Sequence, residues 1–447
     1  MSPPPASAPA EPSDPCDVLI VGGGFTGTSL ACALSDGARR ITVLEARRGP
    51  RPTFAGELIH PTGVEVLDRL GLRGPLERAG AARIDGFAVY RMAGREPEVL
   101  LPYHGAPGVR TTGLAIDHGV MVETLRAEAA GRIGVELRQG VRAEALLREG
   151  GRVVGVRTGD GAELRARLVL SAEGRHSRLR DDLGIAALAR LISFTAALRI
   201  PGARLPHPAF GHIFLGAPGP ILAYPIGGGE ARMCFDLPES VRPDELPRLL
   251  LSRYAPLLPA ALFDDVHRAL LTEQPQLIAT HGMRTEAAVK DGMAIVGDVG
   301  GCAHPLTAGG MTLCLNDVSL LERALDGGAD LAPALSRYQR ERTAMLQTRV
   351  ALTDALYDIF TGAEDGERSL RDGIFRYWQS PRARRASVAL LAGADTRRLS
   401  LSAEYARVIA RAMQGPASRP LPVVRTALRH ARGLLLEGRP ASPPAAR

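Results

Sequence analysis

The stretch VGDVGGCAHPLTAGGMTL, residues 296–313, lies between a short apolar strand and a predicted helix. Asp298 follows the strand directly, where its carboxylate can accept hydrogen bonds from the hydroxyl groups of a ligand. Paired glycines before a helix let a ligand approach the backbone, and the first amides of that helix favour negative charge. This pattern predicts half of a flavin site, with Asp298 at the ribityl hydroxyls. The amides expected at the N1–C2 edge of the flavin ring are those of Gly309, Gly310 and Met311.

A glycine-rich connection that only caps a helix would show the same pattern, so a second motif has to decide between the two. GGGFTG at residues 22–27 follows an apolar strand at 17–21 and precedes a helix rich in Ala and Leu. A second strand, at 41–44, ends at Glu45. GxGxxG between strand and helix, with an acidic residue about 20 positions on for the ribose, is the dinucleotide-binding fingerprint. The predicted contacts are Gly22, Gly24, Gly27 and Glu45.

Composition describes a globular chain without metal or disulfide chemistry. The 447 residues are 45% hydrophobic and 23% charged, enough for two domains of ordinary size. Aromatic residues make up only 4%, which argues against a stacking platform for single-stranded nucleic acid. The five cysteines are odd in number and lack CxxC spacing, which indicates a reducing compartment, no zinc and a cytoplasmic protein.

The positive charge is concentrated at the C-terminus. Residues 376–447 contain 14 arginines and 3 acidic residues, a net charge of +11, so residues 1–375 carry −4 of the total of +7. These arginines alternate with Leu, Val, Ile and Ala at helical spacing, which favours a membrane surface over nucleic acid. Residues 1–15 are Pro-, Ala- and Ser-rich without an apolar run, so we expect disorder there and no signal peptide.

The segments after Glu45 distinguish FAD from NAD, because a dehydrogenase would continue with parallel βα units. Instead, GELIHPTGVEVLDRLGL at residues 56–72 reads as a loop and a helix, and a helix at 120–130 carries Arg126. A later strand, at 164–170, ends near Glu173 and Gly174, a second corner suited to a phosphate group.

The three corners, in this order, resemble those of FAD-dependent monooxygenases with a glutathione-reductase-like FAD-binding fold. Within that group the chain resembles the squalene epoxidase (squalene monooxygenase) family. GELIHPTGVEVLDRLGL resembles that family's GE-hydrophobic-LQPGG helix, and HPLTAGGMT resembles its HPLTGGGMT. Residues 219–236 resemble its P-x-L-x-Y-x-I hairpin and residues 354–399 its C-terminal helices, so the resemblance runs from about residue 16 to about residue 415.

The resemblance implies an α/β fold: a Rossmann-type FAD-binding domain with an inserted β-sheet substrate domain and C-terminal helices. The implied FAD-binding domain comprises residues 16–85, 108–185 and 275–345. The implied substrate domain comprises residues 86–107 and 186–274, and the basic, membrane-facing helical region is 346–447.

Position by position, the resemblance assigns the family's FAD contacts to residues in and between these corners. They are Phe25, Thr26, Glu45, Ala46, Leu58, Arg126, the backbone near Arg142, Asp298 and Met311. Glu173 replaces the Asp of the family's DG corner, and Ala46 stands where the family usually has Arg. Thr53 replaces another family arginine, with Arg51 nearby.

The implied substrate pocket departs further from the family. Its LQPGG glutamine falls on His60 and its pocket tyrosine on Phe87. Because Phe87 cannot form a hydrogen bond, His60 needs another partner or a polar substrate group; a structural histidine is the other interpretation. Further pocket candidates are Tyr224, Pro305 and Leu306, with residues 305–310 as the wall over the flavin ring. The remaining histidines expected to be structural are His104, His118, His281 and His304.

The implied chemistry is that of the cofactor. Reduced FAD adds O2 to give a C4a-hydroperoxide, which transfers an oxygen atom to an alkene while the protein excludes water. We therefore assign no acid or base and expect epoxidation of an apolar, squalene-like isoprenoid. The chain has no second GxGxxG, so NAD(P)H supplies electrons through a transient visit or a flavin reductase. Open alternatives are oxidation of a prenylated quinolone or quinone, an FAD-dependent prenyl reductase, and a binding protein without catalysis.

Two amphipathic helices are expected in the tail, at 402–413 and 423–436. The second places its apolar residues on one side and its arginines on the other. The apolar residues are Val424, Ala427, Leu428, Ala431, Leu434 and Leu435, and the arginines are Arg425, Arg429 and Arg432. Because no run of ~18 apolar residues occurs, we expect a peripheral contact with a membrane surface, or a helix packed on the protein.

Overall fold

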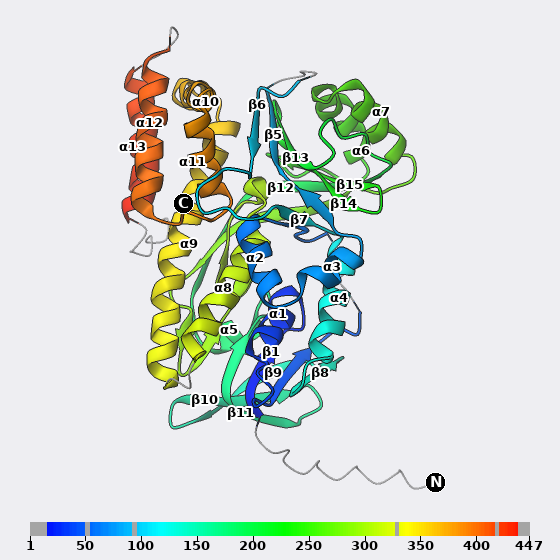
Figure 1. Cartoon of the computed structure of the whole chain (residues 1–447), viewed down its shortest axis with the longest axis vertical. Coiled ribbons are helices and arrows are strands. Elements are labelled where there is room, and N and C mark those ends of the chain that lie inside the picture. The colour runs from blue at the N-terminus through cyan, green and yellow to red at the C-terminus, as the bar shows by residue number, and fades with distance from the viewer. Residues whose placement is uncertain (1–15, 50–53, 92–95, 327–329, 416–419, 437–447) are drawn as a thin grey trace.

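The computed structural model describes residues 16–49, 54–91, 96–326, 330–415 and 420–436, and the side chains of these residues up to 431. The predicted disordered segment 1–15, Arg51 and Thr53 lie outside the described residues. Figure 1 shows three regions: a sheet with helices in the lower half, a second sheet above it, and a stack of helices beside the second sheet.

The lower sheet forms because short runs of aliphatic residues are buried on both faces, as parallel strands require. Its strands follow the order β17–β18–β11–β1–β2–β8, and β9 and β10 extend it through β11. The first strands along the chain are β1 (Cys16–Val21), β2 (Ile41–Glu45), β8 (Val135–Gln139), β9 (Ala143–Glu149) and β10 (Arg152–Thr158). The others are β11 (Glu163–Ser171), β17 (Val289–Lys290) and β18 (Met293–Ile295). β1 pairs in parallel with both β2 and β11, which brings the first and second glycine-rich corners together.

Helices cover this sheet and carry the glycine-rich corners at their N-termini. α1 packs against α4 and α8, and α2 packs against α8. They are α1 (Phe25–Leu34), α2 (Pro61–Arg69), α3 (Arg73–Arg78), α4 (His118–Ala130), α5 (Arg178–Asp182) and α8 (Gly310–Leu325). A small sheet links them to the upper half, with β3 (Leu58–Ile59), β7 (Gly113–Ala115) and β4 (Ala82–Ile84).

The upper sheet has eight strands in the order β19–β16–β12–β15–β14–β13–β5–β6. Its strands are β5 (Gly86–Arg91), β6 (Val99–Pro102), β12 (Ala187–Pro201), β13 (Phe210–Leu215), β14 (Ile221–Gly227), β15 (Glu230–Leu237), β16 (Gln276–Thr285) and β19 (Gly301–Cys302). One face packs on α6 (Leu246–Leu249), the π turn Leu250–Tyr254, the 3-10 turn Ala255–Leu257 and α7 (Ala260–Ala269). The other face shares a core with the C-terminal helices.

The C-terminal helices begin with the long α9 (Leu331–Thr361), which runs from the lower half to the upper half (Figure 1). It is followed by α10 (Asp365–Trp378), α11 (Pro381–Leu391), α12 (Arg398–Met413) and α13 (Pro420–Leu436). The predicted architecture, an α/β domain with an inserted sheet and C-terminal helices, is confirmed. None of the described helices combines the length and the hydropathy that crossing a membrane would need.

The two tail helices exist, and the apolar side expected on α13 is divided between buried and exposed residues. Helix α13 starts at Pro420, because a proline needs no N–H partner in the first turn. Packing on α10 buries Val423, Thr426, Ala427 and His430. Val424 and Leu428, which the spacing places on the same apolar side as Ala427, are instead 39% and 57% exposed.

Candidate active site

The first glycine corner is built so that only glycine fits at its key positions. A Cβ on Gly22 would lie 2.4 Å from the Ala172 carbonyl oxygen, and one on Gly27 would lie 1.8 Å from that of Gly22. A Cβ on Gly24 would meet nothing within 4 Å. Gly24 caps α1 without a side-chain hydrogen bond, so the open space beside it faces helix amides that suit a phosphate group.

Glu45 and Arg126 brace this corner from two sides. The Gly23 N–H donates to Glu45 Oε2 at 2.9 Å, and Arg126 Nε donates to the Gly23 carbonyl at 2.8 Å. Arg126 is buried and its Nη2 lies 3.4 Å from Glu45 Oε2. Both residues therefore set the position of the loop, while Ala46 beside Glu45 is exposed.

The Asp298 corner is held from below by a buried ion pair. Asp317 Oδ2 accepts hydrogen bonds from the Gly297 N–H at 2.9 Å and from Arg342 Nε at 2.8 Å. Asp298 itself accepts only a weak hydrogen bond from the Cys314 thiol, at 3.8 Å, among the described residues. Burial raises the pKa of Asp298, against the opposing charge of Arg175. A sheltered carboxylate with free acceptor capacity fits a polyhydroxylated ligand.

The start of α8 also leaves room for a ligand against its backbone. A Cβ on Gly310 would meet nothing within 4 Å, whereas one on Gly309 would lie 2.5 Å from Arg349 Nη2. Met311 is buried against Gly56. Open space at Gly24 and Gly310 and the available Asp298 carboxylate are what an extended dinucleotide such as FAD requires.

Three other predicted FAD contacts have structural partners. Glu173 Oε2 accepts from Ser171 Oγ at 2.9 Å, Ser177 Oγ at 2.5 Å and the Leu179 N–H at 3.2 Å. Glu173 thus organises the turn into α5, and its second carboxylate oxygen has no hydrogen bond among the described residues. Leu58 is buried in β3, and Arg142 is exposed, with its carbonyl accepting from Gly159.

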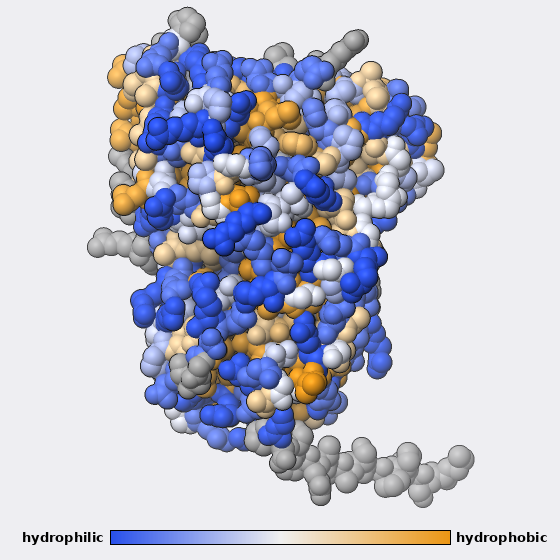
Figure 2. All heavy atoms as spheres, viewed as in Figure 1, coloured by the Kyte–Doolittle hydropathy of each residue, from blue (hydrophilic) through white to orange (hydrophobic). Residues whose placement is uncertain are grey.

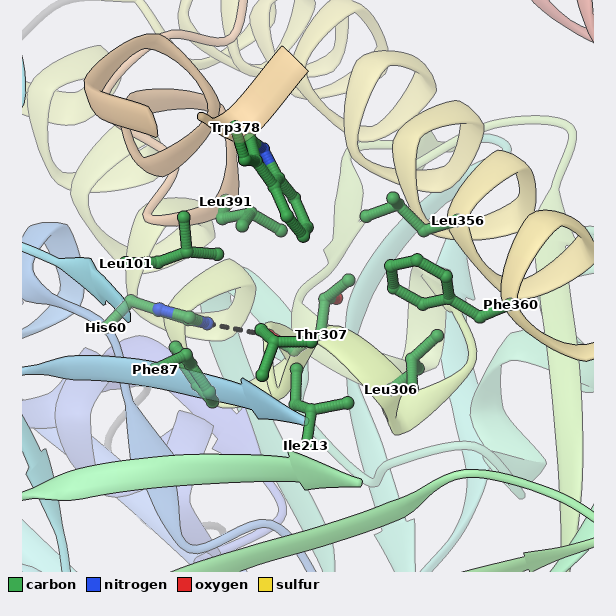
Figure 3. Close-up of a pocket in the computed structure, with 11 residues that line it drawn as sticks. His60, Phe87, Leu101, Ile213, Leu306, Thr307, Leu356, Phe360, Trp378 and Leu391 are labelled. Carbon is green, nitrogen blue, oxygen red and sulfur yellow. Dashed lines mark hydrogen bonds between the residues drawn. The ribbon is translucent and has the colours of Figure 1, made fainter. Parts of the chain in front are cut away.

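A narrow apolar cavity lies where the three regions meet. It holds about 430 Å³ of empty space, counted to its open mouth. Figure 3 shows side chains from the upper sheet, the loop before α8 and the C-terminal helices turned toward one space. The lining residues are His60, Phe87, Val89, Leu101, Ile213, Leu306, Thr307, Leu356, Phe360, Trp378 and Leu391.

His60 finds its partners within the protein. Its Nε2 lies 2.7 Å from the Thr307 carbonyl and so carries the proton, and its Nδ1 accepts from Tyr103 Oη at 2.7 Å. Burial, reinforced by the charge of Arg349, lowers the pKa of His60 to about 3. His60 is therefore neutral. It is a structural histidine with partners in the protein, and it also lines the cavity. Sequence reasoning missed Tyr103. The only signal in the sequence was that an aromatic residue directly follows the β6 strand.

The other pocket candidates divide between the cavity and its surroundings. Phe87 and Leu306 line the cavity, and Pro305 is exposed. Tyr224 is buried but does not line the cavity; its Oη donates to Glu57 Oε2 at 3.3 Å. Glu57 pairs with Arg232, whose Nη2 lies 2.6 Å from Glu57 Oε1, and this buried pair joins β3 to β15.

His304 holds the loop that forms one wall of the cavity. Its Nδ1 accepts from the Leu306 N–H at 3.1 Å, and its Nε2 donates to Asp236 Oδ1 at 3.0 Å. Asp236 also accepts from Ser193 Oγ at 2.5 Å and from Tyr357 Oη at 2.9 Å. This network ties the loop to the upper sheet and to α9, a structural role like the one expected for His304.

Comparison with known proteins identifies the family. The squalene epoxidase family model matches residues 165–421, more than half of the chain. The chain belongs to the squalene epoxidase family. The mouse squalene monooxygenase is 31% identical over 381 residues, which cover 82% of this chain and 66% of the mouse protein. Squalene epoxidase 3 of Arabidopsis thaliana is 31% identical over 400 residues, which cover 86% of this chain and 76% of the plant protein.

Solved structures agree with this family of FAD-dependent monooxygenases. PqsL of Pseudomonas aeruginosa, in complex with 2-aminobenzoylacetate, is 25% identical with a TM-score of 0.67, covering 84% of this chain and 99% of PqsL. The p-nitrophenol 4-monooxygenase PnpA of Pseudomonas putida has a TM-score of 0.72 at 18% identity, covering 88% and 98% of the two chains, and supports the fold alone. FAD is thus the cofactor, as predicted, and NAD(P)H as electron donor is consistent with the family.

Proposed function

We propose that this protein epoxidises a carbon–carbon double bond of an apolar, squalene-like polyprenoid, using O2 and electrons from NAD(P)H. The observation that carries the proposal is the apolar cavity beside the loop before α8 (Figure 3). Among the described lining residues, His60 has both ring nitrogens occupied by protein partners, so it offers no unpaired group to a polar substrate. An apolar molecule has no polar group that would be left without a hydrogen bond on entering such a site.

In this proposal FAD extends from Gly24 past Asp298 to the amides of Gly309 and Gly310. Bound FAD, once reduced, supplies the activation of O2 and the transfer of one oxygen atom. The chain excludes water with the Leu306 and Phe360 side chains and holds the substrate in place. Neutral His60 keeps its proton on Nε2, which donates to the Thr307 carbonyl, so it positions the loop and serves as no acid.

The size of the cavity limits how a long substrate binds. The 430 Å³ includes open solvent at the mouth, and the cavity proper is only about 30 Å³, far below the about 300–1,000 Å³ of ligand pockets, so its lining side chains have to move apart to admit a substrate. A polyprenoid exceeds this space, so we propose that one terminal segment enters and the remaining chain stays outside the mouth. Oxidation of a terminal double bond is the outcome expected from this arrangement.

A membrane supplies such a substrate, and the tail offers a surface for it. Leu421, Val424 and Leu428 recur at spacings of three and four along the outside of α13 and are 83%, 39% and 57% exposed. Figure 2 shows apolar side chains along the outer edge of α12 and α13. Arg425 is exposed beside them. We propose that this stripe rests on an anionic membrane, as a peripheral contact.

A prenylated aromatic, such as a quinolone or quinone, is the second candidate substrate. Phe87, Phe360 and Trp378 give the cavity aromatic walls, and the structurally similar PqsL was solved with an aromatic ligand, 2-aminobenzoylacetate. Membership of the squalene epoxidase family argues against the third candidate, a prenyl reductase.

The experiment is product analysis under 18O2 with the full chain, FAD and NADPH. One set of reactions contains a surrogate flavin reductase and a parallel set omits it. We expect one 18O atom in an epoxide of squalene and none without O2. Ile213→Trp, which fills the cavity, should reduce product at least tenfold, whereas Leu188→Trp, at a residue 57% exposed on β12, should not. FAD content of each variant controls for folding. Exclusive oxidation of the prenylated quinolone, or reduction without O2, would refute the proposal.

A further inference from the structure

Arg349 differs from the other buried arginines of the described chain. Arg126, Arg180, Arg232 and Arg342 each lie within 4.0 Å of a carboxylate. Arg349 is only 6% exposed, yet no carboxylate of the described residues pairs with it. A buried guanidinium without a counter-charge is costly, because burial removes the water that would stabilise it. Such a residue therefore points to a negative group that the protein chain does not provide.

The hydrogen bonds of Arg349 leave part of its charge uncompensated. Nη1 donates to the carbonyls of Leu390 and Leu391, at 2.6 and 2.8 Å, where α11 ends. A helix C-terminus carries roughly half a negative charge, so it offsets only part of a full positive one. Nε and Nη2 have no acceptor among the described residues. Burial lowers the pKa of Arg349 to about 10, so it stays protonated at neutral pH.

Arg349 lies against the turn that opens α8. Its Nη2 occupies the space that a Cβ on Gly309 would take, 2.5 Å from the ideal Cβ position. Gly309 opens the helix whose amides are predicted to face the N1–C2 edge of the flavin. Arg349 does not line the apolar cavity, so a substrate bound there would not contact its guanidinium.

We propose that Arg349 is the electrostatic counter-charge for reduced FAD, acting through the Gly309 turn. This inference rests on the proposed placement of the flavin edge at residues 309–311. Two electrons and one proton, taken from a reduced nicotinamide or a reductase, convert neutral FAD to an anion whose charge is spread over N1 and the C2 carbonyl. A fixed positive charge behind that edge favours the reduced form and keeps it anionic.

The test measures the redox equilibrium of bound FAD, independently of substrate. At a fixed potential, Arg349→Met should lower the ratio of reduced to oxidised FAD at least tenfold, which is about 30 mV for a two-electron couple. Arg349→Lys keeps the charge and should stay within threefold of the wild type. Arg340→Met removes the same charge from an exposed position of the same helix and should change nothing. The pH at which the reduced flavin changes to its neutral absorption spectrum should rise in Arg349→Met.

A second variant separates charge from helix capping. Arg349→Gln keeps an amide donor for the α11 carbonyls but removes the charge, so it should behave like Arg349→Met. FAD content and thermal unfolding are recorded for each variant. If Arg349→Gln holds FAD with the redox ratio of Arg349→Lys, the inference is wrong. Failure to oxidise squalene in the product analysis would leave this redox measurement unaffected, so the two proposals fail separately.

Discussion

At the scale of single residues, the proposed role of Asp298 in binding FAD carries a cost in stability. Its half-buried carboxylate accepts little from the described residues, and burial raises its pKa. Without FAD, folding therefore holds an ionised group in a poorly solvated place. For a carboxyl whose pKa is raised by folding, stability is fully present below the ordinary pKa and is lost as the pH rises through the folded pKa.

Asp298→Asn should separate the two effects. At pH 7 the FAD-free variant should resist urea better than the wild type, and this difference should shrink as the pH falls and Asp298 becomes protonated. FAD affinity should fall roughly 10- to 100-fold, because charge-assisted hydrogen bonds contribute about 1.5–3 kcal/mol. FAD titration of stripped protein measures this. Asp264→Asn, at an exposed carboxylate, serves as control, and unchanged FAD affinity in Asp298→Asn would show that the flavin lies elsewhere.

Because His60 is buried in its neutral form, we expect the protein to lose stability at acid pH. Its pKa falls from an ordinary 6.5 to about 3 in the folded protein, so its contribution to stability is present above pH 6.5 and is lost progressively toward pH 3. At pH 5 this loss is about 2 kcal/mol. Urea unfolding of His60→Gln should therefore show a smaller decrease in stability between pH 7 and pH 5 than the wild type. His104→Gln is the control, and parallel pH curves for the wild type and His60→Gln would contradict the assigned neutral state.

At the scale of elements, the Glu57–Arg232 pair joins the two halves of the enzyme. Glu57 precedes β3, Arg232 lies on β15, and the partners are 1% and 8% exposed in their side chains. Arg232 Nη2 is also 3.7 Å from Asp117 Oδ2, at the start of α4. Burial raises the pKa of Glu57 and the Arg232 charge opposes this, so each partner depends on the other.

Removing one partner should cost more than removing both. Arg232→Met or Glu57→Gln alone should destabilise the protein by about 3–5 kcal/mol, because each leaves a polar or charged group buried without its partner. The double variant should recover part of this loss. Urea unfolding of all four proteins gives the coupling energy. Additive effects would mean that the pair does not hold β3 and β15 together.

At the scale of the whole molecule, the C-terminal helices close the cavity from one side and present an apolar stripe on the other. Trp378 and Leu391 line the cavity, while Leu421, Val424 and Leu428 face outward on α13. Arginines on such a helix each contribute about 1 kcal/mol of attraction to anionic lipid near the surface. A substrate taken from the membrane would then have only the thickness of the helical region to cross.

Co-sedimentation with vesicles tests this orientation. The wild type should bind anionic vesicles at low salt and be released at high salt. Val424→Glu combined with Leu428→Glu should reduce binding at least tenfold, because both residues face outward and can change without disturbing the core. Leu188→Glu combined with Leu271→Glu changes two leucines that are 57% and 75% exposed outside the tail and should bind normally. Equal binding of both double variants would place the membrane contact elsewhere.

The sequence alone determined those features that depend on a few neighbouring residues. Strand, glycine turn and helix are local, so GGGFTG at 22–27 and the stretch around Asp298 were sufficient to predict an FAD-binding fold, and the family motifs extended this to the inserted sheet and the helices. Gly27 shows the reason, because a Cβ there would clash with the Gly22 carbonyl of the same turn, whereas the clash at Gly22 is with Ala172, which follows the distant strand β11.

Only the tertiary structure decided contacts between residues far apart in the chain. His60 meets Tyr103, Glu57 meets Arg232 and Arg349 meets Gly309, and no local pattern distinguishes these partners from other polar residues. The apolar spacing of α13 predicted an amphipathic helix, yet packing against α10 chose Val423 and Thr426 as its buried side. Local propensity determines an element, whereas burial against other elements determines its orientation and which polar groups find partners.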